Sequence, residues 1–454
     1  MTGLLYNQYI SGTKVLEISG KISHYKTTLP WLGPLRELDF GLFIAAISAV
    51  IKDVSRDSPW NASAFVMEHD GMTTQSFCSG FPWDKATTEV TAAATRAVFG
   101  KEIEELSALQ YAHYAACSGG VLPLLDASPG GAQEFKLLGG TQQISETLAQ
   151  PLHIVRDRNV VAIHQDGSSV TVRAFDSAFS VSTYSARRVV VATPPHISAA
   201  FQYSPPLPPN KQKLLQHLTQ GHMIKTVITY PAAFWRQNGF SGEVVSSSGA
   251  PLSQLLTHSI PQNCCKKTHT NASKPDPVSI CYDDSIPHGS STLAPALVCF
   301  VAGRSGVAAS KLTLQQRQQL VLSKLAEYFG PDALHPKQCD PSSCTPPRLA
   351  ATHHAPQRYF ELDWAKEPFT GGCPVGTANA GVITMWGDAI RDAHARVNFA
   401  GTEAATWWPG YMSGALQSGA RAAIEVLTSE GLPVPQSLVD FERMGPDTPS
   451  IALK

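Results

Sequence analysis

The chain has 454 residues, of which 43% are hydrophobic, and this is enough to bury the cores of two or three domains. Because only 16% of the residues are charged and the net charge is -1, composition gives no support for nucleic-acid binding. The longest early apolar run, residues 41–51, is too short to span a bilayer, and no signal peptide follows Met1.

Cysteine usage indicates a reducing compartment. The nine cysteines are odd in number and scattered, which is not the pattern of a secreted disulfide framework. The pair Cys264-Cys265 and the pair formed by Cys339 and Cys344 each lack a partner pair at zinc spacing. No metal site is therefore predicted.

The first third of the chain reads as short strands followed by helices. Residues 14–16 and 23–26 are predicted β segments, and residues 36–118 are predicted to be mostly helical, with an apolar stripe at 111–114. A turn at 129–131, a strand at 133–136 and a helix carrying Ile144 and Leu148 follow. No G-x-G-x-x-G sequence occurs anywhere, although that fingerprint normally opens a dinucleotide-binding βαβ unit.

The middle of the chain is predicted to be rich in strands. Residues 160–163, 170–172 and 187–192 read as three strands of one antiparallel piece, with a turn at Asp166-Gly167 joining the first two. A polar insertion at 261–277 reads as a surface loop, a strand resumes at 297–301, and an amphipathic helix covers 312–328.

Lys225 lies inside the apolar strand 224–228. Burying an unpaired ammonium costs several kcal/mol, so this lysine must be solvated, paired or functional. An edge strand with a snorkelling lysine is the structural alternative to a functional role.

The most informative stretch is 397–427. Residues 397–400 read as the end of a buried strand, and Gly401-Thr402-Glu403 form a turn whose backbone a ligand can approach closely. A loop through Pro409-Gly410 leads into a helix whose apolar face is predicted to contain Leu416, Ala420, Ala423, Ile424 and Leu427, opposite Gln417, Arg421 and Glu425. Such strand-turn-helix units hold cofactors in α/β folds, and an ordinary core βα unit is the alternative.

This stretch closely resembles the C-terminal signature of the flavin-dependent amine oxidases, and among them the monoamine oxidases. Trp364 and Thr370-Gly371-Gly372-Cys373 resemble the segment that carries the family's covalent flavin, at the family's spacing. The resemblance covers nearly the whole chain but not the family's N-terminal flavin-binding unit, so we expect either a truncated gene model or a reduced homologue.

The resemblance implies a mixed α/β (α+β) fold of two domains, in which an incomplete Rossmann-like FAD domain is interleaved with a substrate domain. FAD-domain segments are expected at 1–30, 139–205 and 364–430. The substrate domain is expected at 31–138, as helices, and at 206–363, as sheet and helices, with a C-terminal tail at 431–454.

The resemblance also assigns residues. Expected cofactor-binding residues, with a thioether at the cysteine, are Cys373, Val160, Trp364, Gly401, Thr402, Glu403, Gly410 and Met412. Expected substrate-cavity residues are Leu125, Gln133, Phe300 and Tyr411, although from the residues alone Leu125 reads as core and Gln133 as surface. Lys225, which would hold a water at the reactive flavin nitrogen, and Tyr411, one wall of an aromatic cage, are the expected catalytic residues. Pro374 stands where the family has the second cage tyrosine.

The implied function is FAD-dependent oxidation of a small amine to an imine and then an aldehyde, with oxygen reduced to hydrogen peroxide. A homodimer is compatible with the resemblance. The alternative is a catalytically impaired or non-catalytic homologue that binds an amine or a partner protein. A demethylase of the same superfamily would need a long helical hairpin, which is not found, whereas an amino-acid oxidase is left open.

The chain after Leu427 bears on location. Two prolines within three residues and repeated charges exclude a transmembrane anchor there, and the terminal Ala-Leu-Lys differs from the Ser-Lys-Leu type of peroxisomal signal. We therefore expect a soluble intracellular protein, in the cytoplasm or associated with mitochondria.

Overall fold

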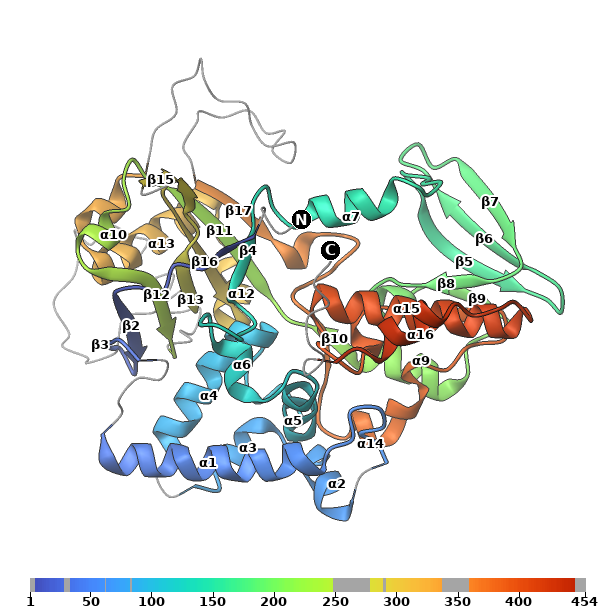
Figure 1. Ribbon diagram of the computed structural model, residues 1–454, viewed down its shortest axis with the longest axis horizontal. Helices are drawn as coiled ribbons and strands as arrows, with labels where there is room; N and C mark the ends of the chain where they lie inside the picture. The colour runs from blue at the N-terminus through green and yellow to red at the C-terminus, as the bar shows by residue number, and fades with distance from the viewer. Residues whose placement is uncertain are drawn as a thin grey trace.

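The computed structural model describes residues 5–27, 33–61, 63–81, 84–247, 278–288, 291–336 and 359–445. The insertion at 261–277 and the cysteines at 264, 265, 339 and 344 lie outside these ranges. In Figure 1 a large sheet with its helices lies on the left, a helical layer lies below it, and a smaller sheet with the C-terminal helices lies on the right.

Seven strands of the described residues form the largest sheet, which carries Lys225. Their order is β17 (Tyr359–Asp363), β11 (Met223–Thr229), β16 (Ala296–Ala302), β13 (Ile280–Asp283), β12 (Phe240–Ser246), β2 (Thr13–Ile18) and β3 (Lys21–Tyr25). All neighbours are antiparallel except β12 and β2, which are parallel. The strands predicted at 14–16, 23–26, 224–228 and 297–301 are confirmed.

Helix α13 (Leu314–Phe329) packs on this sheet. It begins with a capping box between Thr313 and Gln316, and it buries Val321, Leu325 and Tyr328 at helical spacing. These side chains share one core cluster with Trp235 of α10 (Phe234–Gln237) and with the apolar residues of β11. The predicted helix at 312–328 is confirmed.

A buried charged cluster joins this helix to β2. Lys324 Nζ lies 3.0 Å from Glu17 Oε2, and the two side chains are only 6% and 2% exposed. Tyr328 donates its hydroxyl to the same carboxylate at 2.5 Å. Neither charge is solvated by bulk water, so both are stabilised by the charged and polar protein groups around them.

Cys281 and Cys299 form a disulfide between the neighbouring strands β13 and β16. The cysteine pattern, which indicated no secreted disulfide framework and a reducing compartment, did not predict this disulfide. The disulfide forms because the register of the two strands places Cys281 directly opposite Cys299. Spacing along the sequence does not reveal this register.

The helical layer confirms the prediction for residues 36–118. It contains α1 (Pro34–Asp53), α2 (Ala64–Asp70), α3 (Thr74–Cys78), α4 (Asp84–Phe99), α5 (Ala108–Cys117) and α6 (Val121–Leu125). The side-chain oxygen of Ser107 caps α5, which buries Leu109, Tyr111 and Tyr114 in the layer's core.

The smaller sheet corrects one prediction. Its order is β7 (Val181–Ala186), β6 (Val170–Phe175), β5 (Asn159–Gln165) and β9 (Gln202–Ser204). The third antiparallel strand is thus β7, which was not predicted because its polar side chains are mostly exposed. The predicted third strand at 187–192 is instead β8 (Val189–Val191), which pairs in parallel with β19 (Val397–Phe399).

Helix α15 (Met412–Ser429) corrects another prediction, because its buried face differs from the apolar stripe. Leu416 is 42% exposed, whereas Gln417 is buried. Gln417 Oε1 accepts from the backbone N–H groups of Thr406 and Trp407, and its Nε2 donates to Thr406 Oγ1. A fully hydrogen-bonded glutamine can take a core position that hydrophobicity assigns to leucine.

Short elements complete the described chain: β1 (Leu5–Asn7) with β4 (Phe135–Leu137), β10 (Leu218–Gln220) with β18 (Gly376–Ala378), β14 (Ile286–His288) with β15 (Ser291–Ala294), α7 (Gln142–Ala149), α8 (Pro195–Ala199), α9 (Pro209–His217), α12 (Gly303–Ala309), η2 (Pro331–Leu334), η3 (Trp364–Lys366), α14 (Val382–Trp386), η4 (Gly387–Ile390), η5 (Thr402–Ala404) and α16 (Gln436–Arg443). No helix of the described residues has both the length and the apolar character needed to cross a membrane.

Candidate functional site

The candidate site lies where the parallel strands β8 and β19 end. Both carboxyl ends open on the same edge, the usual ligand position in α/β sheets, and Ala400 N donates to Val191 O at 2.8 Å there. Gly401 follows with φ of 123°, and the nearest heavy atom to a Cβ built on it is 3.6 Å away. The backbone at Gly401 is therefore open to a ligand.

The turn after β19 is tied to the start of α15. Thr402 Oγ1 accepts from Gly410 N at 2.6 Å and donates to Tyr411 O at 3.1 Å. Tyr411 is the N-cap residue of α15 but makes no side-chain capping bond, so free N–H groups begin at Met412. The structure thus brings together Gly401, Thr402, Gly410, Tyr411 and Met412.

Glu403 links this turn to the segment after Cys373. Its Oε1 accepts from Gly376 N at 2.9 Å and from Gln220 Nε2 at 3.5 Å. Burial raises the pKa of Glu403, and the hydrogen bond from Gly376 opposes that shift.

Cys373 lies against the loop that precedes β11. Its backbone N–H donates to Gly221 O at 3.0 Å. Only glycine fits at 221, because a Cβ there would lie 1.9 Å from Phe99 O and 2.6 Å from Cys373 O. Burial raises the pKa of the Cys373 thiol to about 11, and the nearby ammonium of Lys225 lowers it. The thiol is therefore neutral at physiological pH.

Lys225 lies on an interior strand of the large sheet, the second of its seven strands. Strand β11 pairs with β16 on one side and β17 on the other, so Lys225 is flanked by Phe300 and Leu362. The edge-strand alternative is wrong. Lys225 Nζ lies 5.7 Å from the centroid of the Phe300 ring, and within the described ranges no ion pair involves this ammonium.

The four other predicted site residues lie on separate elements of the fold. Trp364 begins η3 after β17, and its carbonyl accepts from Thr370 Oγ1 at 3.4 Å. Val160 is in β5 and packs on the core of the smaller sheet. Leu125 ends α6, and Gln133 lies just before β4 with its side chain exposed. The roles of these four residues in binding remain predictions.

Sequence reasoning missed four residues that border the site: His196, Gln220, Gly221 and Tyr114. Tyr114 matters because its hydroxyl lies against Gly410, where a Cβ would be 2.3 Å from Tyr114 Oη. A glycine in the two-residue connection between β10 and β11 is the signal that would have drawn attention to Gly221. No sequence pattern marks His196, Gln220 or Tyr114 as residues of the site.

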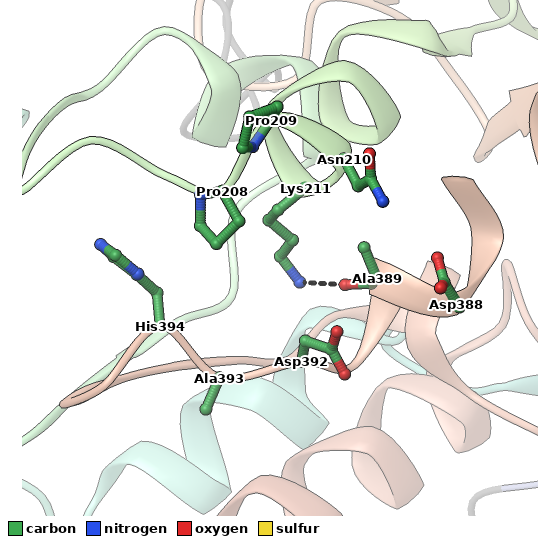
Figure 2. Close-up of a pocket in the computed structure, with 9 residues that line it drawn as sticks. All are labelled: Pro208, Pro209, Asn210, Lys211, Asp388, Ala389, Asp392, Ala393 and His394. Carbon is green, nitrogen blue, oxygen red and sulfur yellow. Dashed lines mark hydrogen bonds between the residues drawn. The ribbon is translucent and has the colours of Figure 1, made fainter. Parts of the chain in front are cut away.

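A separate hollow of about 250 Å³ lies between α9, η4 and the loop before β19 (Figure 2). Lys211, which is 2% exposed, donates to Ala389 O at 2.7 Å and to Ile390 O at 2.9 Å, and its Nζ lies 3.9 Å from the centroid of the Phe399 ring. Its donors are occupied by the protein, so Lys211 acts as a clamp between α9 and η4.

Lys211 gives a pH-dependent prediction. Burial lowers its pKa to about 7, Arg421 adds to that shift, and Asp392 opposes it. Between about pH 7 and the unfolded pKa of about 10.4, the folded state binds fewer protons, so stability rises with pH. We expect Lys211→Met to remove about 2 kcal/mol of the rise between pH 7 and pH 9. Urea unfolding of both proteins at the two pH values measures it, and parallel pH dependences would contradict it.

Comparison with known proteins assigns the chain to a protein family. The family model for flavin containing amine oxidoreductase matches residues 15–427. The chain belongs to this family. A protein described as a probable flavin-containing monoamine oxidase A of Dictyostelium discoideum is 30% identical over 426 residues, which are 93% of this chain and 81% of that protein. The flavin-containing amine oxidase of Oncorhynchus mykiss is 29% identical, over 93% of this chain and 71% of that protein.

Solved structures of flavin amine oxidases share the fold. Cyclohexylamine oxidase from Brevibacterium oxydans IH-35A has a TM-score of 0.75 at 23% identity, with 94% of this chain and 83% of that chain covered. Wild-type putrescine oxidase bound to putrescine has a TM-score of 0.75 at 22% identity with the same coverage. The expected flavin amine oxidase fold is thereby confirmed. Membership in the flavin amine oxidases makes the protein an oxidoreductase whose cofactor is FAD.

Proposed function

We propose that this flavin amine oxidase is of the monoamine oxidase type and oxidises a small primary or secondary amine, with oxygen reduced to hydrogen peroxide. The observation that carries the proposal is that Lys225 lies near both Phe300 and Cys373, and that the segment after Cys373 is hydrogen-bonded through Gly376 to Glu403, which follows β19. A cation, an aromatic wall and a thiol at a cofactor edge match the requirements of flavin-dependent amine chemistry.

The residues present fit FAD. The open backbone at Gly401 and the uncapped start of α15 offer space and free N–H donors to a polar cofactor. Glu403 offers a buried carboxyl group that can form a hydrogen bond with a hydroxyl group of the cofactor. When bound, FAD supplies the two-electron acceptor for the carbon next to the amine nitrogen. Cys373 would hold it covalently, and Lys225 would position a water beside it.

The substrate would lie against Tyr411, whose ring is steadied by an edge contact with Trp408 at 5.1 Å. Pro374, which stands where the family has the second cage tyrosine, follows Cys373 and is exposed. An aromatic wall contributes about 0.5–2 kcal/mol to binding a cation or ring. With Tyr411 as a single aromatic wall, the site would therefore bind the amine less tightly than a site with two aromatic walls.

The proposal is tested with the purified full-length chain. We expect a visible flavin spectrum, together with hydrogen peroxide formation that depends on an added amine. The panel should include cyclohexylamine and putrescine, on which the structural relatives are named. A flavin spectrum without turnover of any amine would favour the alternative of a non-catalytic homologue, and a colourless protein that does not take up added FAD would contradict the proposal.

Covalent attachment gives a second test. After acid precipitation we expect the flavin to remain with the wild-type protein and to be released from Cys373→Ala, because Cys373 is the described free cysteine at the site. The control is Cys78→Ala, which changes a buried free cysteine of α3 and should keep the flavin attached. Flavin still bound covalently to Cys373→Ala would refute the thioether assignment.

A further inference from the structure

His196 lies in α8, directly after β8, at the edge where β8 and β19 end. Among the described residues, neither of its ring nitrogens has a hydrogen-bond partner, although both atoms are buried. Neighbouring polar groups of the same turn are satisfied, since Ser198 Oγ lies 2.8 Å from Thr193 Oγ1 and donates to Thr193 O at 3.2 Å. Within this turn, the buried side-chain atoms without a partner among the described residues are the two imidazole nitrogens.

Three other histidines of the described residues make a hydrogen bond through a ring nitrogen. His113 Nε2 lies 3.0 Å from Arg56 O, His217 Nδ1 lies 2.8 Å from Lys213 O, and His394 Nε2 lies 3.0 Å from Pro205 O. Burial lowers the pKa of His196, so its imidazole is neutral and carries one donor and one acceptor. A buried donor and acceptor that are both unpaired point to a missing partner.

The position of the ring indicates where that partner binds. A Cβ built on Gly371 would lie 2.5 Å from His196 Nε2, so the ring ends directly against Gly371, two residues before Cys373. Gly372 in turn lies against Gln220, where a Cβ would be 2.5 Å from Gln220 Cβ, and Gln220 donates to Glu403. The imidazole therefore belongs to the same shell of residues as the predicted flavin contacts.

We propose that His196 is a cofactor-binding residue, whose imidazole exchanges hydrogen bonds with bound FAD or with a water that FAD orders. The inference rests on the proposed function, because it requires FAD at this edge. It predicts that the imidazole is an unsatisfied group in the FAD-free protein and becomes satisfied when the cofactor binds.

The test uses the full chain carrying Cys373→Ala, so that FAD binds reversibly and its dissociation constant can be measured by flavin fluorescence. His196→Phe keeps a planar ring and removes both nitrogens, whereas His196→Gln keeps a donor and an acceptor. We expect the dissociation constant to rise at least tenfold in His196→Phe and to recover at least in part in His196→Gln. His394→Phe is the matched control, and it should change FAD affinity less than twofold.

A second readout separates cofactor binding from a structural role. Because His196→Phe removes unpaired polar atoms from a buried site, the thermal midpoint of the FAD-free protein should stay the same or rise. An unchanged FAD affinity would overturn the proposal, and so would a weaker affinity accompanied by an equal loss of FAD-free stability. If the Cys373→Ala reference bound no FAD at all, the proposed function would fail together with this inference. If the reference bound FAD and His196→Phe bound it with the same affinity, this inference alone would fail.

Discussion

Lys225→Met is expected to slow the reaction of the reduced enzyme with oxygen by more than tenfold, which is at least ~1.4 kcal/mol of barrier, while FAD stays bound. The side chain lies over Phe300 on an interior strand of the large sheet and near Cys373, and no ion pair among the described residues gives it a structural purpose. Methionine keeps the length of the side chain and removes the charge and the hydrogen-bond donors. Stopped-flow reoxidation of the amine-reduced enzyme measures the effect.

Lys136 provides the matched control for this experiment. It lies near Lys225, but its Nζ is paired with Asp284 Oδ1 at 2.5 Å and donates to Asp283 O at 2.8 Å. Lys136→Met should therefore affect stability more than the oxygen reaction. Equal reoxidation rates in wild type and Lys225→Met would remove Lys225 from the catalytic residues.

Glu17→Gln is expected to lower the free energy of unfolding by about 3–5 kcal/mol, because it removes the buried carboxylate beside the ammonium of Lys324 and leaves the partly exposed carboxylate of Glu327 as an ion-pair partner. Lys324 and Glu17 are almost fully inaccessible, and Tyr328 donates to the same carboxylate. Urea unfolding followed by circular dichroism measures the loss.

Two further variants make the explanation specific. Glu327 also contacts Lys324, at 3.1 Å, but its side chain is 40% exposed, so Glu327→Gln should cost less than about 1 kcal/mol. The double variant Glu17→Leu with Lys324→Met removes both charges and should be considerably more stable than Glu17→Gln. A double variant no more stable than Glu17→Gln would show that the loss does not come from an incompletely compensated charge.

Residue patterns predicted most strands and helices, but not which of them pair. Residues 187–192 were correctly read as a strand, yet β8 joins β19 in parallel instead of extending the antiparallel sheet. Apolar content shows that a segment is buried, and it does not identify the partner strand. In α15 the apolar stripe gave the wrong face, because Gln417 is buried by hydrogen bonds that depend on the distant residues Thr406 and Trp407.

The same limit applies to the candidate site. Lys225 could be found from the sequence because a charge inside an apolar strand is unusual, and the turn at 401–403 because it follows a strand and precedes a helix. His196 and Gln220 could not, since their significance comes from Gly371, Gly372 and Glu403, which the fold brings to them. Contacts between distant segments are a property of tertiary structure that local periodicity does not encode.

The strand order of the large sheet also has a consequence for biosynthesis. Strand β11, which carries Lys225, lies between β16 and β17, and β2 pairs with β12 from more than half the chain away. During translation, β11 has an unpaired edge until residues 359–363 have left the ribosome. Such non-local pairing slows folding and leaves apolar strand edges open to aggregation in the meantime. The nascent chain must therefore complete the pairing of the strand that carries Lys225 after nearly four-fifths of its length has been made, and chaperones that shield strand edges should raise the yield of folded protein.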